Sequence, residues 1–161
     1  MVTVADARAR VEAVVDPELP FVTIAELGIL RAVEVDGNQV NVTITPTYSG
    51  CPAMSAIAAD VRAALNGTGA EVSIDTVLSP AWTTDWMTAA GRDKLHAAGI
   101  APPTHSAGDL ETGAVPIALS VRCPQCGSAR TRELSRFGST SCKALWRCDD
   151  CLEPFDSFKV L

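Results

Sequence analysis

The sequence predicts an α+β protein: a small α-β-β-α-β domain with a mixed sheet, followed by a C-terminal zinc-ribbon β domain. Two observations lead to this prediction. Four of the six cysteines form two Cys-x-x-Cys pairs in the last third of the chain, Cys123/Cys126 and Cys148/Cys151, which is the spacing of a tetrahedral thiolate site. Before these pairs, segments with helical periodicity alternate with segments that have the two-residue periodicity of strands.

The first predicted element is a helix from Thr3 to Val15. Thr3 and Asp6 form a capping pair. Apolar residues recur on one face of the helix at Val4, Ala7, Val11, Val14 and Val15. Asp16-Pro17-Glu18 then ends the helix, because a residue that precedes proline disfavours helical backbone.

Three strands and a second helix follow. Strands over 27–35 and 39–45 flank the turn 36–38, and Val40, Val42 and Ile44 alternate with polar residues, which predicts a hairpin with one buried face. The second helix begins at Cys51-Pro52. Its apolar face consists of Met54, Ile57, Ala58, Val61 and Leu65. A strand over 71–78 is expected to pair in parallel in the same sheet, because a helix connects it to the hairpin.

A further helix is predicted from Thr83 or Thr84 to Gly99. For Trp82 and Trp86, packing in a core is favoured over contact with a partner. From residue 100 to 116, prolines, glycines and small polar residues indicate a linker.

Charge and cysteine content also divide the chain. Residues 1–118 have a net charge of −8 and one cysteine, whereas residues 119–161 have a net charge of +2 and five cysteines. We therefore expect an α/β domain over 1–99, a linker over 100–118 and a four-cysteine ribbon over 119–161.

Two alternatives to a metal site would also produce paired cysteines. A thioredoxin-like redox pair occurs singly and precedes a helix, whereas these pairs are doubled and flanked by strand-like runs. Disulfides are disfavoured because the first residues lack the basic region and apolar stretch of a signal peptide, so a cytoplasmic location is expected. Zinc is the favoured ion. Iron in a rubredoxin-like site is the alternative, since four thiolates discriminate poorly between the two metals.

Composition restricts the partners. Hydrophobic residues make up 47% of the chain, which supports a real core. No apolar run has the length of a membrane span, so a soluble protein is expected. The overall charge of −6, and the near neutrality of a ribbon with bound thiolates, disfavour nucleic acid as a partner.

Cys51 is a second candidate site. A thiol at a helix N-terminus lies at the positive end of the helix dipole, which favours a thiolate that binds metal transiently or attacks an electrophile. No histidine is close in sequence to act as a base, so a small buried residue is the simpler interpretation. Asp16, Glu18 and Glu26 are similarly interpreted as turn and surface carboxylates. Because no triad, phosphate-binding loop or dinucleotide motif occurs, we expect no enzyme active site.

Over nearly its full length, the chain resembles a known family. Residues 4–80 look like the SufT-like domain of iron–sulfur assembly factors. The motifs are Asp16-Pro17-Glu18-Leu19-Pro20, Leu27-Gly28-Ile29, Thr45-Pro46-Thr47 and Ser49-Gly50-Cys51-Pro52. The continuation is similar to the PaaD family of accessory subunits, which are encoded with the bacterial phenylacetyl-CoA ring-epoxidase. Its motifs are residues 80–86, 99–103, 137–145 and 151–155.

The resemblance implies an accessory role beside the oxygenase, a cytoplasmic location and partners among the other epoxidase components, above all the reductase that carries flavin and a [2Fe–2S] cluster. The chain has no Glu-x-x-His pair from which to build a di-iron centre of its own. Cys51 matches the cysteine of the assembly motif, and Asp16 and Glu18 match its acidic motif. These residues are therefore candidates for holding iron or a cluster briefly, while the ribbon docks the client.

Two questions accompany this hypothesis. One thiolate cannot hold a [2Fe–2S] cluster, so a homodimer or a ligand from the client is needed. Cys142 is a fifth exchangeable thiolate, a second cluster ligand or a buried strand residue, and the last is favoured. A maturation factor, a structural adaptor of the epoxidase complex and a nucleic-acid-binding ribbon are the competing functions, and charge disfavours the third.

Overall fold

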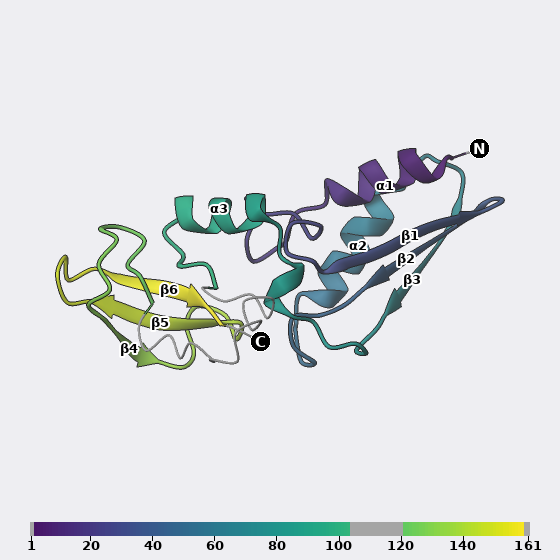
Figure 1. Ribbon diagram of the computed structural model, residues 1–161. Helices are drawn as coiled ribbons and strands as arrows, with labels where there is room; N and C mark the ends of the chain where they lie inside the picture. Colours follow the sequence, from purple (N-terminus) through teal and green to yellow (C-terminus); the bar gives the residue numbers. More distant parts are fainter. Residues whose placement is uncertain (1, 104–120, 160–161) are drawn as a thin grey trace, which may run out of the picture. The chain divides into compact units, whose positions relative to one another are not determined.

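The computed structural model describes residues 2–103 and 121–159, and Figure 1 shows their secondary structure. Within these residues there are three α-helices and two three-stranded sheets, which confirms the predicted α+β class. Contacts group the described residues into two compact units. The first unit consists of residues 2–82 and 86–88, and the second of 83–85, 89–103 and 121–159.

Helix α1 (Val4–Glu12) opens the first unit. The Thr3 hydroxyl accepts the Asp6 amide proton at 3.1 Å and donates to the Asp6 carboxylate at 2.6 Å, which is the predicted capping pair. The helix is shorter than the predicted one, which extends to Val15. Val15 forms a β-bridge with Thr23 instead, because the approach of Pro17 disfavours further helical backbone.

The first sheet has the strand order β1-β2-β3, with β1 (Leu30–Asp36), β2 (Gln39–Ile44) and β3 (Glu71–Thr76). Strands β1 and β2 form the predicted antiparallel hairpin. Helix α2 (Met54–Ala64) connects β2 to β3, which pairs with β2 in parallel as expected. This is the predicted mixed sheet. Strand β1 begins three residues later than predicted, after Gly28, whose φ of +73° is incompatible with a strand.

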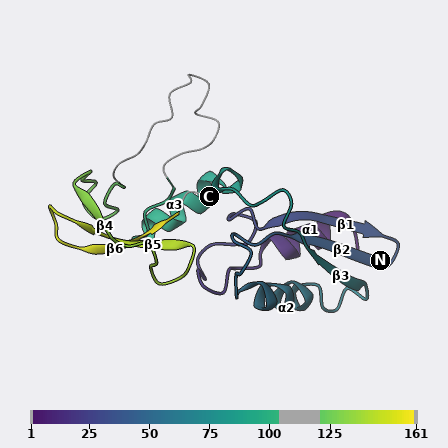
Figure 2. The ribbon, with the colours of Figure 1, turned by 90° about the horizontal axis from the view of Figure 1, so that it is seen from below.

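One face of this sheet is covered and the other is polar. Val40, Val42 and Ile44 of β2 are completely buried, whereas the alternating Asn41 and Thr43 are half-buried. Helices α1 and α2 contact each other, and Figure 2 shows them from below the view of Figure 1. Their own completely buried residues are Ala7, Val11, Ile57 and Val61. The core of the first unit therefore lies between the two helices and one face of the sheet.

The two tryptophans belong to different environments. Trp82 is 4% exposed, and its indole N–H donates to the Leu27 carbonyl at 3.0 Å, so the expected core packing is confirmed for this residue. Trp86 is half-buried, and the Arg31 guanidinium lies 3.4 Å from the centroid of its ring. The helix predicted to run to Gly99 is divided into a 3₁₀ turn η1 (Thr84–Trp86) and helix α3 (Ala89–Ala97).

The second unit combines α3 with an antiparallel sheet of order β4-β5-β6, formed by β4 (Thr131–Ser135), β5 (Lys143–Cys148) and β6 (Pro154–Phe158). After α3, Ala101 pairs with Ser157 of β6. Ala101, Cys123, Cys148 and Phe155 form a small buried core. Helix α3 is therefore connected to the ribbon sheet through the residues that directly follow it.

The predicted linker over 100–118 lies mostly outside the described residues, which resume at 121. Its first residues, Ile100 and Ala101, are buried in the second unit. The boundaries 1–99, 100–118 and 119–161 concern independently folding domains, and they stay a prediction. Within the described part of the chain, no helix is both long and apolar enough to cross a membrane.

Candidate metal centre

Two tight turns bring the four ribbon cysteines together. Cys123 and Cys126 lie in the turn before β4, and Cys148 ends β5 and precedes Cys151 in the connection to β6. Gly127 directly follows the first pair with a φ of +75°, and its amide donates to the Cys123 carbonyl at 2.9 Å. Cys123 and Cys148 are buried, while Cys126 and Cys151 are exposed. One side of the cluster therefore faces the small core and the other faces solvent.

The sulfur positions fit a tetrahedral ion. The four Sγ atoms lie within 4.8 Å of one another, with Cys123–Cys151 at 3.7 Å and Cys126–Cys148 at 3.6 Å. Zinc–sulfur bonds of about 2.3 Å at tetrahedral angles require sulfur atoms about 3.8 Å apart. A disulfide requires about 2.05 Å, and all four thiols are free. In the described residues, this is the one group of three or more His, Cys, Asp or Glu side chains placed to hold a metal.

The thiols of the cluster differ in how readily they ionise. The Cys151 amide donates to the Cys148 sulfur and lowers the pKa of Cys148 to about 7, although burial acts in the opposite direction. The Glu153 amide lowers the pKa of Cys151, but burial and the neighbouring thiols outweigh it and raise this pKa to about 12. Four adjacent thiolates repel one another, so their joint ionisation requires a bound positive ion.

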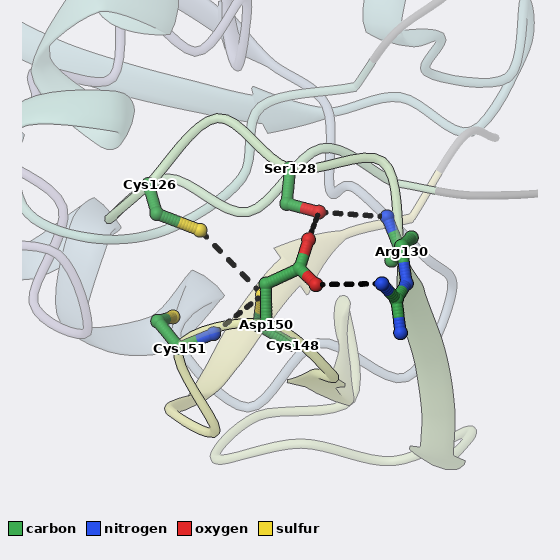
Figure 3. Close-up of polar contacts among 6 residues, drawn as sticks. All are labelled: Cys126, Ser128, Arg130, Cys148, Asp150 and Cys151. Carbon is green, nitrogen blue, oxygen red and sulfur yellow. Dashed lines mark hydrogen bonds and ion pairs between the residues drawn. The ribbon is translucent and has the colours of Figure 1, made fainter.

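A polar network connects the two turns (Figure 3). The Ser128 hydroxyl accepts the Arg130 amide proton at 3.0 Å and hydrogen-bonds to the Asp150 carboxylate. The Arg130 guanidinium pairs with the same carboxylate at 3.1 Å. Asp150 belongs to the second Cys-x-x-Cys turn, and Ser128 and Arg130 directly follow the first. These exposed contacts are individually weak, but together they help to orient both ligand pairs.

Cys142 lies apart from this centre. It directly precedes β5, whereas Cys148 ends that strand, and a rise of about 3.3 Å per residue separates them by about 20 Å. The Cys142 side chain is buried, with the Thr140 hydroxyl 3.1 Å from its sulfur. Of the three roles that the sequence leaves open for Cys142, burial beside the strand is the one that its position favours.

Cys51 occupies a loop of the first unit. It is half-buried, and its amide donates to the Tyr48 carbonyl at 3.1 Å. The sequence predicts Cys51 at the start of a helix, but α2 begins only at Met54, after the N-cap Ala53. The amides of the first helical turn are thus further from Cys51 in sequence than predicted, so a helix dipole accounts less well for an activated thiol.

Asp16 and Glu18 differ in their surroundings. Asp16 is 6% exposed, and one of its carboxylate oxygens accepts the amide protons of Glu18 at 2.8 Å and Leu19 at 2.9 Å. This carboxylate therefore stabilises the turn that follows α1. Glu18 is exposed. Glu26 also makes a local hydrogen bond, in which its carboxylate accepts the Thr23 amide proton at 2.9 Å.

The topology brings the residues that directly precede β1 and the loop that leads to Cys51 to the same end of the first sheet. Strands β1 and β2 are antiparallel, with Leu30 opposite Ile44, so the residues before β1 and after β2 leave the sheet together. The hydrogen bond from the Thr45 amide to the Ile29 carbonyl, 2.9 Å long, continues this pairing. No group of three or more His, Cys, Asp or Glu side chains placed to hold a metal includes Cys51 among the described side chains.

Known protein families match the two parts of the chain separately. Residues 5–77 match the family described as "Iron-sulfur cluster assembly protein", and residues 110–159 match the "PaaD zinc beta ribbon domain". The fold and the four-cysteine site thus define a protein that joins an iron–sulfur-assembly-type α/β domain to a zinc ribbon.

A relative from Escherichia coli, a subunit of the "Putative 1,2-phenylacetyl-CoA epoxidase" of that organism, is 47% identical to the chain over 147 residues. The match covers 91% of this chain and 86% of the relative. The chain belongs to the PaaD family, as its motifs indicate.

Two further similarities concern the first unit. The "Fe-S protein maturation auxiliary factor" of Porphyromonas gingivalis is 39% identical over 77 residues, which are 46% of this chain and 72% of that protein. A solved structure, the domain of unknown function DUF59 from Bacillus anthracis, has a TM-score of 0.53 and 33% identity. The match covers 57% of this chain and 90% of that structure. The first match supports similarity of the first unit to iron–sulfur maturation factors, and the second supports its fold.

Proposed function

We propose that this chain is a non-enzymatic accessory subunit of a multicomponent phenylacetyl-CoA 1,2-epoxidase. Its task is to assist the delivery of iron or an iron–sulfur cluster to an oxygenase or reductase component, with the reductase as the favoured client. The observation that carries the proposal is similarity to an epoxidase subunit along both units of the chain, one of which is an assembly-type domain. The four ribbon cysteines are not joined by disulfides, which is consistent with work in a reducing cytoplasm.

Two metal roles are divided between the two units. Four protein ligands close the ribbon site, as in structural zinc centres, so an ion there stabilises the ribbon and leaves no open position for a substrate. The cargo therefore requires another site, for which Cys51 is the candidate thiolate. Since one thiolate does not complete an iron–sulfur site, further ligands must come from a second copy of the chain or from the client.

The proposal predicts poorly loaded epoxidase components in the absence of this chain. When the epoxidase genes are expressed without it, iron per oxygenase or [2Fe–2S] cluster per flavin in the reductase should fall at least severalfold. Metal analysis and visible absorbance of the purified components measure both quantities. Re-expression of the wild-type chain serves as the control and should restore loading. Equal loading with and without the chain would refute a maturation function.

A structural adaptor that stabilises the epoxidase complex is the second candidate. The Asp16 carboxylate accepts hydrogen bonds from the amides of its own turn, which favours a structural role for this residue and hence the adaptor. The adaptor function is also consistent with the finding that, among the described residues, Cys51 belongs to no group of three or more side chains placed to hold a metal. An adaptor requires stable co-purification with the complex and complete indifference of loading to Cys51→Ala, whereas a carrier requires that this variant fails to restore loading.

A further inference from the structure

The loop between β4 and β5, residues 136–142, is fixed by a carboxylate of β6. The Asp156 side chain accepts hydrogen bonds from the Ser139 hydroxyl at 2.6 Å and the Ser139 amide at 3.4 Å. The Lys143 ammonium lies 3.8 Å from the same carboxylate, and the Lys143 side chain is only 5% exposed. Gly138 lies against this carboxylate, which occupies the space that a side chain at position 138 would need.

A second residue near the end of β6 holds the other side of this β4–β5 loop. The Lys159 ammonium donates to the Ser141 carbonyl at 2.7 Å, and the Lys159 amide donates to the Cys142 carbonyl at 3.0 Å. Within the loop, the Gly138 amide donates to the Lys143 carbonyl at 2.8 Å. The backbone of the loop is therefore held by side chains and main chain on both sides.

This ordered loop presents an aromatic side chain to solvent. Phe137 is 69% exposed, the largest fraction among the exposed large hydrophobic residues of the described chain. The Lys159 ammonium lies 4.5 Å from the centroid of the Phe137 ring, which leaves much of the ring surface accessible. Phe137 contributes little to the core, so packing of its side chain does not account for the order of this loop. The loop is nevertheless fixed by a nearly buried ion pair, and desolvation makes such pairs costly.

Charge indicates the kind of partner. Lys143 and Asp156 neutralise each other, whereas Lys159 lies against the Phe137 ring and Arg136, the exposed residue that directly precedes Phe137, adds a second positive charge to the loop. The four thiolates of the metal centre lie at the other end of β5 and do not offset these cations locally. Aromatic anchors surrounded by charged residues are typical of protein interfaces, in which the charges form a polar rim.

We propose that Phe137 anchors a docking surface, formed by the β4–β5 loop and Lys159, for a component of the epoxidase. The contact surface of that component has an apolar pocket rimmed by carboxylates. Fixing the loop before association reduces the conformational entropy that binding would otherwise cost. This inference rests on the proposed function, because it names the surface through which the accessory subunit reaches its client.

Binding of the purified full-length chain to each purified epoxidase component, measured by calorimetry at two salt concentrations, tests the proposal. Phe137→Ala should weaken binding by about thirtyfold, the loss typical of an interface anchor. Arg136→Glu should also weaken it, because the reversed charge faces carboxylates. Leu78→Ala is the matched control: Leu78 is a 59% exposed apolar residue of the first unit and should leave binding unchanged. Unaltered zinc content and thermal unfolding would show that the variants are folded.

The outcomes distinguish a failure of the proposed docking surface from a failure of the proposed accessory function. Loss of binding in Phe137→Ala and Arg136→Glu, but not in Leu78→Ala, supports the docking surface. Wild-type affinity in Phe137→Ala overturns it while the accessory function stands, and tighter binding by Arg136→Glu contradicts the carboxylate rim. If the wild-type chain binds no epoxidase component, the accessory function fails, and the docking surface fails with it.

Discussion

Replacing Cys148 by serine is expected to abolish metal binding at the four-cysteine site and to unfold the ribbon of the second unit. Cys148 is completely buried, ends β5 and belongs to the small core with Cys123 and Phe155. Zinc binding contributes about 10–16 kcal/mol in small zinc domains, whereas a whole domain is typically stable by only about 5–15 kcal/mol. Metal analysis should fall from about one zinc per chain to near zero, and amide protons of β4–β6 should lose their protection from exchange.

Cys142→Ser is the matched control for this prediction. Cys142 is also buried, but it lies at the opposite end of β5 and outside the four-sulfur cluster. Its replacement should leave zinc content unchanged and lower the stability only modestly, because the hydroxyl is slightly smaller and more polar than the thiol. Zinc loss in Cys142→Ser, or full zinc occupancy in Cys148→Ser, would contradict the assignment of the ligands.

The second large effect is expected from Gly28→Ala in the first unit. Gly28 has a φ of +73°, and an added Cβ would lie 2.6 Å from both the Cβ and the carbonyl oxygen of Trp86. Left-handed backbone costs a residue with a side chain about 1–2 kcal/mol, and overpacking costs about 1–3 kcal/mol more. Denaturant unfolding monitored by tryptophan fluorescence should show a loss of about 2–5 kcal/mol.

Gly67→Ala separates the two causes. Gly67 has a similar φ of +79°, but no atom lies within 4 Å of the position of an added Cβ. This variant should therefore show only the conformational cost of about 1–2 kcal/mol. Equal losses in the two variants would mean that Trp86 does not pack against Gly28 in solution.

The features that the sequence predicts well depend on local chemistry. Cys123, Cys126, Cys148 and Cys151 form two pairs, each separated by two residues, so each turn is determined by its own short segment, and the structure brings the two turns together. The alternation of Val40, Val42 and Ile44 similarly predicts one buried face without knowledge of what covers it. Spacing and periodicity are therefore sufficient for the fold class and the arrangement of the first sheet.

Features that depend on contacts distant in sequence could not be predicted. The Arg92 guanidinium donates to the carbonyls of Thr84 at 2.7 Å and Pro103 at 2.9 Å, which fixes the ends of α3 within the second unit. Nothing in the helical pattern of residues 89–97 indicates that this helix belongs to the second unit. The network around Asp156 is likewise not predictable, because its members lie in a loop and a strand whose pairing is not visible in the sequence.

The Asp150 network escapes prediction for a different reason. Asp149 and Asp150 are the two residues between Cys148 and Cys151, and only the cysteines have a spacing that is typical of a metal site. An acidic residue inside one Cys-x-x-Cys turn, together with Ser128 and Arg130 after the other, is the signal that could have suggested the link. Such polar patterns are common at surfaces, so this signal is weak by itself.

The central claim is that the chain keeps a resident zinc ion in the ribbon and carries iron through Cys51. Metal stoichiometry and visible spectra of anaerobically purified wild type and Cys51→Ala test it most directly. The account predicts about one zinc per chain in both proteins, and labile iron with visible absorbance in the wild type alone. Zinc alone in both proteins would contradict a carrier function for Cys51 and would favour the structural adaptor.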